Sequence, residues 1–315
     1  MPTVRDSWRA EVFEIFRRNS IEGVPLLDVY MALVAVSDKA TPTGIRIEHC
    51  PVTIGCIGAH FDISAAGGAS PQCGGPVFPT DALRIHEEVA EEHANLTALG
   101  RLMTVVEHLT LVAYLQYLNQ RQARVLGSVG FIIDGPLALF GPQAWLHTAI
   151  LNFLRASTAE LLRAGFNVPV VIGIEKGGQF AEHADAVSDR IPLRTVMTLP
   201  DDYIYRYILT FRPSTSGSFG RDTYYGQKFF YRTAQGQLLT ITIPKLAAEG
   251  VYDAQAYSML PTTLLLLDRI GTSLYKDATI PIALAHSFAS IPLRTGSHVL
   301  TLLSQRLLNT SEQTV

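Results

Sequence analysis

Gly130-Phe131-Ile132-Ile133-Asp134-Gly135-Pro136 is the stretch that decides the predicted fold. Its apolar residues fit a short buried strand, and Gly135-Pro136 ends that strand directly after Asp134. A carboxylate at the end of a buried strand lies at the sheet edge where α/β proteins bind ligands. There Asp134 can hold a hard cation, or it can cap the next helix or begin a turn, and both interpretations stay open.

Helices and strands alternate around this stretch. A long helical pattern with a break near Asn95 precedes it, running from Asp81 to about Arg124, and a helix over 143–165 and a strand over 168–174 follow it. This order favours right-handed crossovers and a strand parallel to the Asp134 strand. An α/β protein is therefore expected.

The outer parts of the chain contain further predicted elements. Leu26–Val36, ending at Ser37-Asp38, and Ile45–Cys50 are expected to form an antiparallel hairpin across a turn at Thr41–Gly44. The remaining expectations are an amphipathic helix over 5–18, an irregular insertion over 50–79, strands over 203–212 and 228–243 with a turn at 234–236, and helices over 256–273 and 282–291.

Composition restricts the class of protein. The chain has 315 residues, of which 48% are hydrophobic and 17% charged, so it can bury a large core. Its net charge of -3 argues against a free-standing nucleic-acid binder of high affinity. The first residues lack the apolar core of a signal peptide. The charge-free run between Asp134 and Arg155 fits a core helix better than a membrane span. The three cysteines suggest a reduced, cytoplasmic protein.

Four further ionisable residues are candidates for a site with Asp134. Glu107 lies at the edge of an apolar helix face, where a carboxylate must be paired, protonated or bound to a metal. Glu175 and Lys176 end the next strand, at the same sheet edge as Asp134 if the two strands are parallel. Either Lys176 binds a phosphate there, or the two residues are an ordinary strand-to-loop charge pair. His286 is alone in an apolar segment, either as a core residue or as a metal ligand or general acid/base.

The stretch Phe219–Arg232 interleaves cations with aromatic residues. Arg221, Lys228 and Arg232 suit a nucleic-acid backbone, and the rings beside them suit stacked bases. An ordinary aromatic hairpin explains the same stretch almost as well.

The cysteines raise the question of a zinc site. Cys50, Cys56 and Cys73, with His49 and His60, supply enough ligands for a zinc knuckle. Their spacing does not match paired CxxC clips, so buried free thiols are favoured over Zn²⁺.

Three segments together resemble the NurA nuclease family. They are Asp134-Gly135-Pro136-Leu137-Ala138, Ile174-Glu175-Lys176 and Pro281-Ile282-Ala283-Leu284-Ala285-His286, within a resemblance that covers about residues 25–305. The resemblance implies a single nuclease domain over 1–315 with a ribonuclease-H-like mixed sheet and flanking helices. It also implies DNA as substrate, Mn²⁺ or Mg²⁺ as cofactor, a hexameric HerA-type ATPase as partner and a homodimer, without a membrane.

The resemblance also assigns roles to residues of this chain. Asp134 matches the family's strand-end metal ligand, His286 its catalytic histidine and Glu107 its helix carboxylate. The family's first strand ends in Asp-Gly-Ser, which this chain lacks, and Asp38 is the nearest substitute. The family's Tyr-Pro pair before the histidine is also missing, and Tyr275 is the nearest replacement.

Three hypotheses follow from the sequence. The first is a metal-dependent deoxyribonuclease for end processing, repair or phage defence, with metal ligands among Asp134, Glu107, Asp38 and Glu175. The second is a catalytically inactive subunit that assembles with a HerA-type ATPase, as the missing Asp-Gly-Ser suggests. The third is a structural protein stabilised by zinc at the cysteines.

Overall fold

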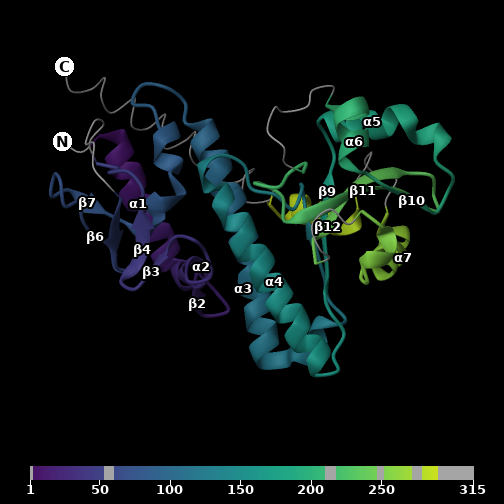
Figure 1. Cartoon of the computed structure of the whole chain (residues 1–315), viewed down its shortest axis with the longest axis horizontal. Helices are drawn as coiled ribbons and strands as arrows, with labels where there is room; N and C mark the ends of the chain where they lie inside the picture. Colours follow the sequence, from purple (N-terminus) through teal and green to yellow (C-terminus); the bar gives the residue numbers. More distant parts are fainter. Residues whose placement is uncertain (1–2, 53–59, 210–217, 247–251, 272–278, 290–315) are drawn as a thin grey trace, which may run out of the picture.

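A mixed five-stranded sheet, with helices on both faces, forms the part of the protein that follows α3 in the chain (Figure 1). The structure, a computed structural model, describes residues 3–52, 60–209, 218–246, 252–271 and 279–289. The sheet has the strand order β10-β11-β12-β9-β8. In Figure 1 the two long helices α3 and α4 lie between this sheet and the N-terminal elements.

The sheet combines one parallel pair with antiparallel neighbours. β8 (Gly130–Ile133) is parallel to β9 (Val170–Glu175), with Ile133 opposite Gly173, as the sequence predicts. β12 (Leu238–Pro244) is antiparallel to both β9 and β11 (Gly226–Arg232), and β10 (Thr195–Thr198) lies at the outer edge. The predicted hairpin over 228–243 is confirmed.

The strands bury both of their faces. Along β9, Val171 packs in a cluster with α3 and α4, whereas Ile172 and Ile174 pack in a second cluster with α7. Consecutive side chains of a strand point to opposite faces, so β9 is an almost unbroken apolar run that separates two helical layers. The helices concerned are α3 (Leu96–Leu126), α4 (Leu146–Arg163), α7 (Leu260–Ile270) and a helix over Ile280–Ala289.

The chain turns sharply after β8 and crosses the sheet. The Leu137 amide donates to Thr242 Oγ1 of β12 at 2.9 Å, and the Tyr225 amide donates to the Leu137 carbonyl at 3.0 Å. Gly173 leaves room for this crossing, because a Cβ there would be 2.4 Å from the Gly135 carbonyl oxygen. The backbone just after Asp134 is thus fixed by three strands.

The N-terminal elements pack against the same core. One apolar cluster runs from Phe16 of α1 through Tyr30 of α2 to Leu109 of α3 and Ile133 of β8. The elements are α1 (Val4–Arg18), α2 (Leu26–Val34), β1 (Ser20–Ile21), β2 (Val24–Pro25), β3 (Ala40–Thr41), β4 (Gly44–Ile47), β5 (Phe61–Ile63), β6 (Gly68–Ala69) and β7 (Pro76–Val77). The segment over 50–79 therefore contains short strands as well as loops.

The predicted strand over Leu26–Val36 is wrong, because these residues form α2. Leu26, Tyr30 and Leu33 are buried at the spacing of one helix face, and Pro25 stands just before the first helical turn, where its missing amide costs nothing. The predicted hairpin with Ile45–Cys50 is therefore absent, and the turn over 41–44 joins β3 to β4. Asp38 lies exposed in the turn between α2 and β3 and ends no strand.

The predicted strand over 203–212 is also wrong in its described part. Residues Asp201–Tyr203 form α6, and Ile204–Ile208 continue as a π-helical turn. Ile204 and Ile208 are buried in one apolar cluster, whereas Arg206 between them is exposed; a strand would place all three on one face, and a helix does not. Residues 210–212 lie outside the described part.

The other helical elements differ from expectation mainly in their bounds. The segment before Asn95 forms two 3-10 turns, Pro79–Leu83 and Ile85–Glu88, in place of regular α-helix. Further 3-10 turns are Pro142–Trp145, Ser188–Arg190 and Ala254–Ala256, and α5 covers Gln179–Val187. Within the described residues, α3 alone has the length and apolar composition of a membrane span, but it packs in the core beside α2 and α4.

Candidate functional site

Three side chains that are far apart in the sequence meet at the end of β8. Asp134 Oδ1 lies 2.8 Å from Lys176 Nζ, and Asp134 Oδ2 lies 2.7 Å from His286 Nε2. They come from the ends of β8 and β9 and from the helix over 280–289. The sequence placed all three among its candidates, and the structure brings them into direct contact.

The sheet explains this meeting. Because β8 and β9 are parallel, residues 134 and 176 follow the two strands at the same edge. The period of two along a strand places both side chains on the face that carries Ile172 and Ile174. Ile282, one turn before His286, packs into the apolar cluster on that face, so the helix aims His286 at Asp134.

Glu107 adjoins this group from the opposite face of the sheet. It lies on α3, and its carboxylate accepts a hydrogen bond from the backbone amide of Asp134. Partial desolvation, and then the negative charge of Asp134, raise the pKa of Glu107 above its usual range, although the amide acts in the other direction. Two carboxylates thus stand close enough to repel each other.

The group is open to solvent and mixed in charge. The exposed fractions of the side chains are 65% for His286, 32% for Asp134 and 26% for Lys176. An accessible imidazole held by a carboxylate can move a proton, and a lysine ammonium can bind an anion. The arrangement can therefore bind a phosphate and transfer a proton beside it.

The donors also fit one hard cation. Mg²⁺ commonly uses one or two protein carboxylates, with water and substrate phosphate oxygens completing its shell, and Asp134 and Glu107 can supply these two. Desolvation first, and then the charge of Asp134, raise the pKa of Glu107, and a cation between the two carboxylates would offset both effects. Among the described residues no group of three or more histidine, cysteine or acidic side chains forms a complete protein-built metal site.

Glu175 belongs to a different environment. Its side chain lies on the opposite face of the sheet from that of Asp134. There it forms an ion pair with Lys228, whose ammonium is almost fully buried. The Lys228 Nζ lies 4.1 Å from the ring centre of Phe180 and 4.8 Å from that of Tyr224. Burial lowers the pKa of Lys228, and Glu175 opposes that shift. The proposed role of Glu175 as a metal ligand beside Asp134 has no support in this geometry.

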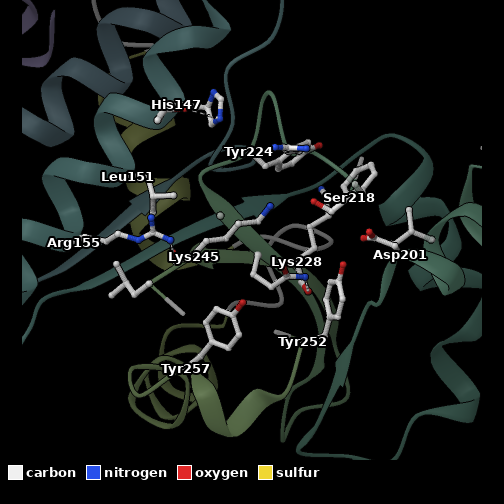
Figure 2. A pocket seen from close by; sticks show the side chains of 17 residues that line it. His147, Leu151, Arg155, Asp201, Ser218, Tyr224, Lys228, Lys245, Tyr252 and Tyr257 are labelled. Carbon is white, nitrogen blue, oxygen red and sulfur yellow. Dashed lines mark hydrogen bonds between the residues drawn. The ribbon is translucent and has the colours of Figure 1, made fainter. Parts of the chain in front are cut away.

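The three predicted DNA-binding cations separate. Arg221 and Lys228 line a cavity between α4 and α6, which Figure 2 shows from close by. Arg232 lies at the other end of β11, where its guanidinium donates to the carbonyl oxygens of Ser188 and Ile191, both at 2.6 Å. Arg232 therefore ties β11 to the turn after α5 and does not line the cavity.

Asp38, Tyr275 and the cysteines lie away from Asp134 or outside the described part. Asp38 is in the N-terminal turn, outside the central sheet, and Tyr275 falls in the segment 272–278, which is not described. Cys50 Sγ and Cys73 Sγ lie 3.7 Å apart as thiols, and Cys56 is not described.

Sequence reasoning missed a buried polar pair next to Glu107. Tyr225 Oη lies 2.6 Å from His108 Nδ1, and the His108 ring also donates to the Ala138 carbonyl. The pair ties α3 to the segment that follows Asp134, so it positions Glu107 beside the Asp134 amide. The signal available in the sequence was the polar residue within the apolar helix face of Val105, Leu109 and Val112.

His108 should make folding sensitive to acid. Burial lowers the pKa of His108 to about 4, from the ordinary value near 6.5 that the unfolded chain retains. Between these values the unfolded chain binds a proton that the folded protein excludes, so the free energy of unfolding falls as the pH falls through this window. The expected loss from this residue is on the order of 3 kcal/mol by pH 4.

Denaturant unfolding at several pH values from 7 to 4 checks this expectation for the wild type and His108→Gln. The variant should be less stable at pH 7 and should show a flatter decline toward pH 4. Parallel curves for the two proteins would contradict a buried neutral His108.

Comparison with known protein families, with curated proteins and with solved structures finds no significant match to this chain. The class is therefore defined by the fold alone: a mixed α/β protein, with a five-stranded mixed sheet and helices on both faces.

Proposed function

We propose that this protein is a metal-dependent nuclease that hydrolyses phosphodiester bonds of DNA. The observation that supports this most is the meeting of Asp134 with Lys176 and His286 at a solvent-open sheet edge, with Glu107 beside them. Carboxylates, a cation and an imidazole from separate elements are the groups that phosphodiester hydrolysis needs. The sequence resemblance to the NurA family, made through Asp134, Lys176 and His286, points the same way.

Each residue has a distinct role in this proposal. Asp134 and Glu107 would hold Mn²⁺ or Mg²⁺, which would supply the charge that activates water and stabilises the leaving oxygen. Lys176 exchanges its contact with Asp134 for a phosphate oxygen and offsets the charge that develops there. His286 carries a proton to or from the reacting oxygens, and Asp134 orients its ring.

The same proposal extends to the fold family and the partners. A ribonuclease-H-like core, a homodimer, a cytoplasmic location and a hexameric HerA-type ATPase as partner are what the resemblance implies. The net charge of -3 suits an enzyme to which a motor delivers DNA better than one that captures DNA alone.

A second candidate is a catalytically inactive subunit of such a complex. Both carboxylate oxygens of Asp134 already contact side chains, Lys176 and His286, and Asp38 lies outside the sheet. A protein that keeps this ion-paired arrangement would bind its partner and DNA without cleaving DNA.

A cleavage assay separates the two candidates. Linear double-stranded and single-stranded DNA is incubated with the protein in Mn²⁺, Mg²⁺ or EDTA, with and without a HerA-type ATPase. The nuclease proposal expects digestion that depends on the metal and stops in EDTA. A stable complex with the ATPase and no digestion under any condition would favour the inactive subunit.

A further inference from the structure

A cavity of about 570 Å³ opens on the sheet face that carries Lys228 and Glu175. Its walls are α4, α6 with the π-helical turn, and the adjoining ends of β11 and β12. In Figure 2, Arg155 and Lys245 enter from the α4 side, with Asp201 and Tyr252 opposite them. The volume lies within the range of roughly 300–1,000 Å³ that is usual for small-molecule sites.

The cavity concentrates positive charge. Arg155, Arg221, Lys228 and Lys245 all line it, while Asp201 is the acidic residue among the lining side chains. The Asp201 carboxylate accepts a hydrogen bond from the Tyr252 hydroxyl. Burial lowers the pKa of Lys228, and repulsion from the positive charge of Lys245 adds to this shift. In a chain with a net charge of -3, such a concentration marks a place for an anion.

The fold holds two of these cations, Arg155 and Lys228, in place. Arg155 Nη2 donates to the Lys245 carbonyl at 2.9 Å, which joins α4 to the end of β12. Lys228 is held in the floor by Glu175 and by the faces of Phe180 and Tyr224. Pre-positioned cations lose little side-chain entropy when an anion binds.

Aromatic side chains line the same cavity. They are Phe219, Tyr224, Tyr252 and Tyr257, and Tyr257 is fixed edge-on against Phe229 with 5.2 Å between ring centres. Such rings stack on nucleobases, and the cations beside them suit phosphate oxygens.

We propose that this cavity binds a phosphorylated nucleoside, with the phosphate on Arg155 and Lys245 and the base against the tyrosines. A free nucleotide and one unit of a single DNA strand present the same chemistry to the cavity. The lining residues do not include Asp134, Lys176, His286 or Glu107, so the proposal stands independently of nuclease activity.

Isothermal titration calorimetry in EDTA tests the proposal on the full chain. The probes are dAMP, deoxyadenosine, inorganic phosphate and a ten-nucleotide oligothymidine. We expect binding of dAMP, and binding of deoxyadenosine or phosphate alone that is at least about tenfold weaker, since each lacks one of the two contacts. If the oligothymidine binds tenfold tighter than dAMP, the ligand is a single DNA strand. If dAMP binds tenfold tighter than the oligothymidine, the ligand is a free nucleotide.

Variants place the binding in the cavity. Arg155→Gln and Lys245→Gln should each weaken dAMP binding about tenfold or more, since each removes a charged hydrogen-bond donor. The matched control is Arg163→Gln, which changes an exposed arginine at the end of the same helix and should leave binding unchanged. Both cavity variants are measured so that misfolding of one of them does not decide the result. Circular dichroism checks that each variant is folded.

Two outcomes overturn the proposal: no binding of dAMP or oligothymidine at millimolar concentration, or binding that neither cavity variant weakens. Asp134→Asn separates this test from the nuclease test, because it should remove cleavage and leave dAMP binding intact.

Discussion

Lys228→Met is expected to lower the free energy of unfolding by about 3–5 kcal/mol, the usual cost of breaking a buried ion pair from one side. The methionine can fill the space of the lysine stem between Phe180 and Tyr224. The loss arises instead at Glu175, whose side chain is only 10% exposed and would lose the buried ammonium with which it pairs. Urea unfolding followed by circular dichroism measures the change.

A second variant separates the charge from the packing. Lys228→Met combined with Glu175→Leu removes both charges and should recover most of the lost stability, since well-packed apolar pairs often replace buried ion pairs without cost. The control is Lys245→Met, which changes a half-buried lysine on the same cavity and should cost about 1 kcal/mol or less. Equal losses in Lys228→Met and Lys245→Met would contradict a special role for the buried pair.

Under the nuclease proposal, Asp134→Asn is expected to reduce DNA cleavage in Mn²⁺ by about 100-fold or more. The amide has nearly the shape of the carboxylate but lacks its negative charge, so it binds a divalent cation weakly and no longer orients His286 as a charged partner. The protein should remain folded, because the Asp134 side chain is one-third exposed. Initial rates on linear DNA, measured at several Mn²⁺ concentrations, report the loss.

Two comparisons sharpen this result. Asp189→Asn removes an exposed aspartate from the turn after α5 and should keep full activity. His286→Gln should slow cleavage and alter its pH profile, which a purely structural histidine would not do. Wild-type rates in Asp134→Asn would exclude Asp134 from the reaction.

Local pattern was enough to predict the centre of the fold. The sequence shows an apolar run that ends at Asp134, then an amphipathic helix, then a second apolar run. This order correctly predicted β8, α4 and β9 and the parallel pairing of the two strands. The same pattern placed Asp134 and Lys176 at one edge. His286 could be named as a candidate, but its approach to Asp134 depends on a helix 152 residues away, which no local pattern reveals.

The errors have physical causes as well. Leu26–Val36 is rich in leucine and valine, and such a short apolar run fits a strand or a buried helix equally well until its packing partners are known. Glu175 and Lys176 are neighbours in the sequence, but the pleat of β9 sends them to opposite faces, so only Lys176 reaches Asp134. The pairing of His108 with Tyr225 spans 117 residues and is likewise a product of tertiary packing.

The separation of these partners has a consequence for the protein during its synthesis. When β8 leaves the ribosome, Glu107 and Asp134 have already been synthesised. The strands β9 to β12, α7 and the helix over 280–289 must still be added before His286 is present. Chains fold from the N-terminus during synthesis, which adds about 5–20 residues per second. A half-made chain therefore holds two acidic residues without the histidine, and the complete group forms only late in translation.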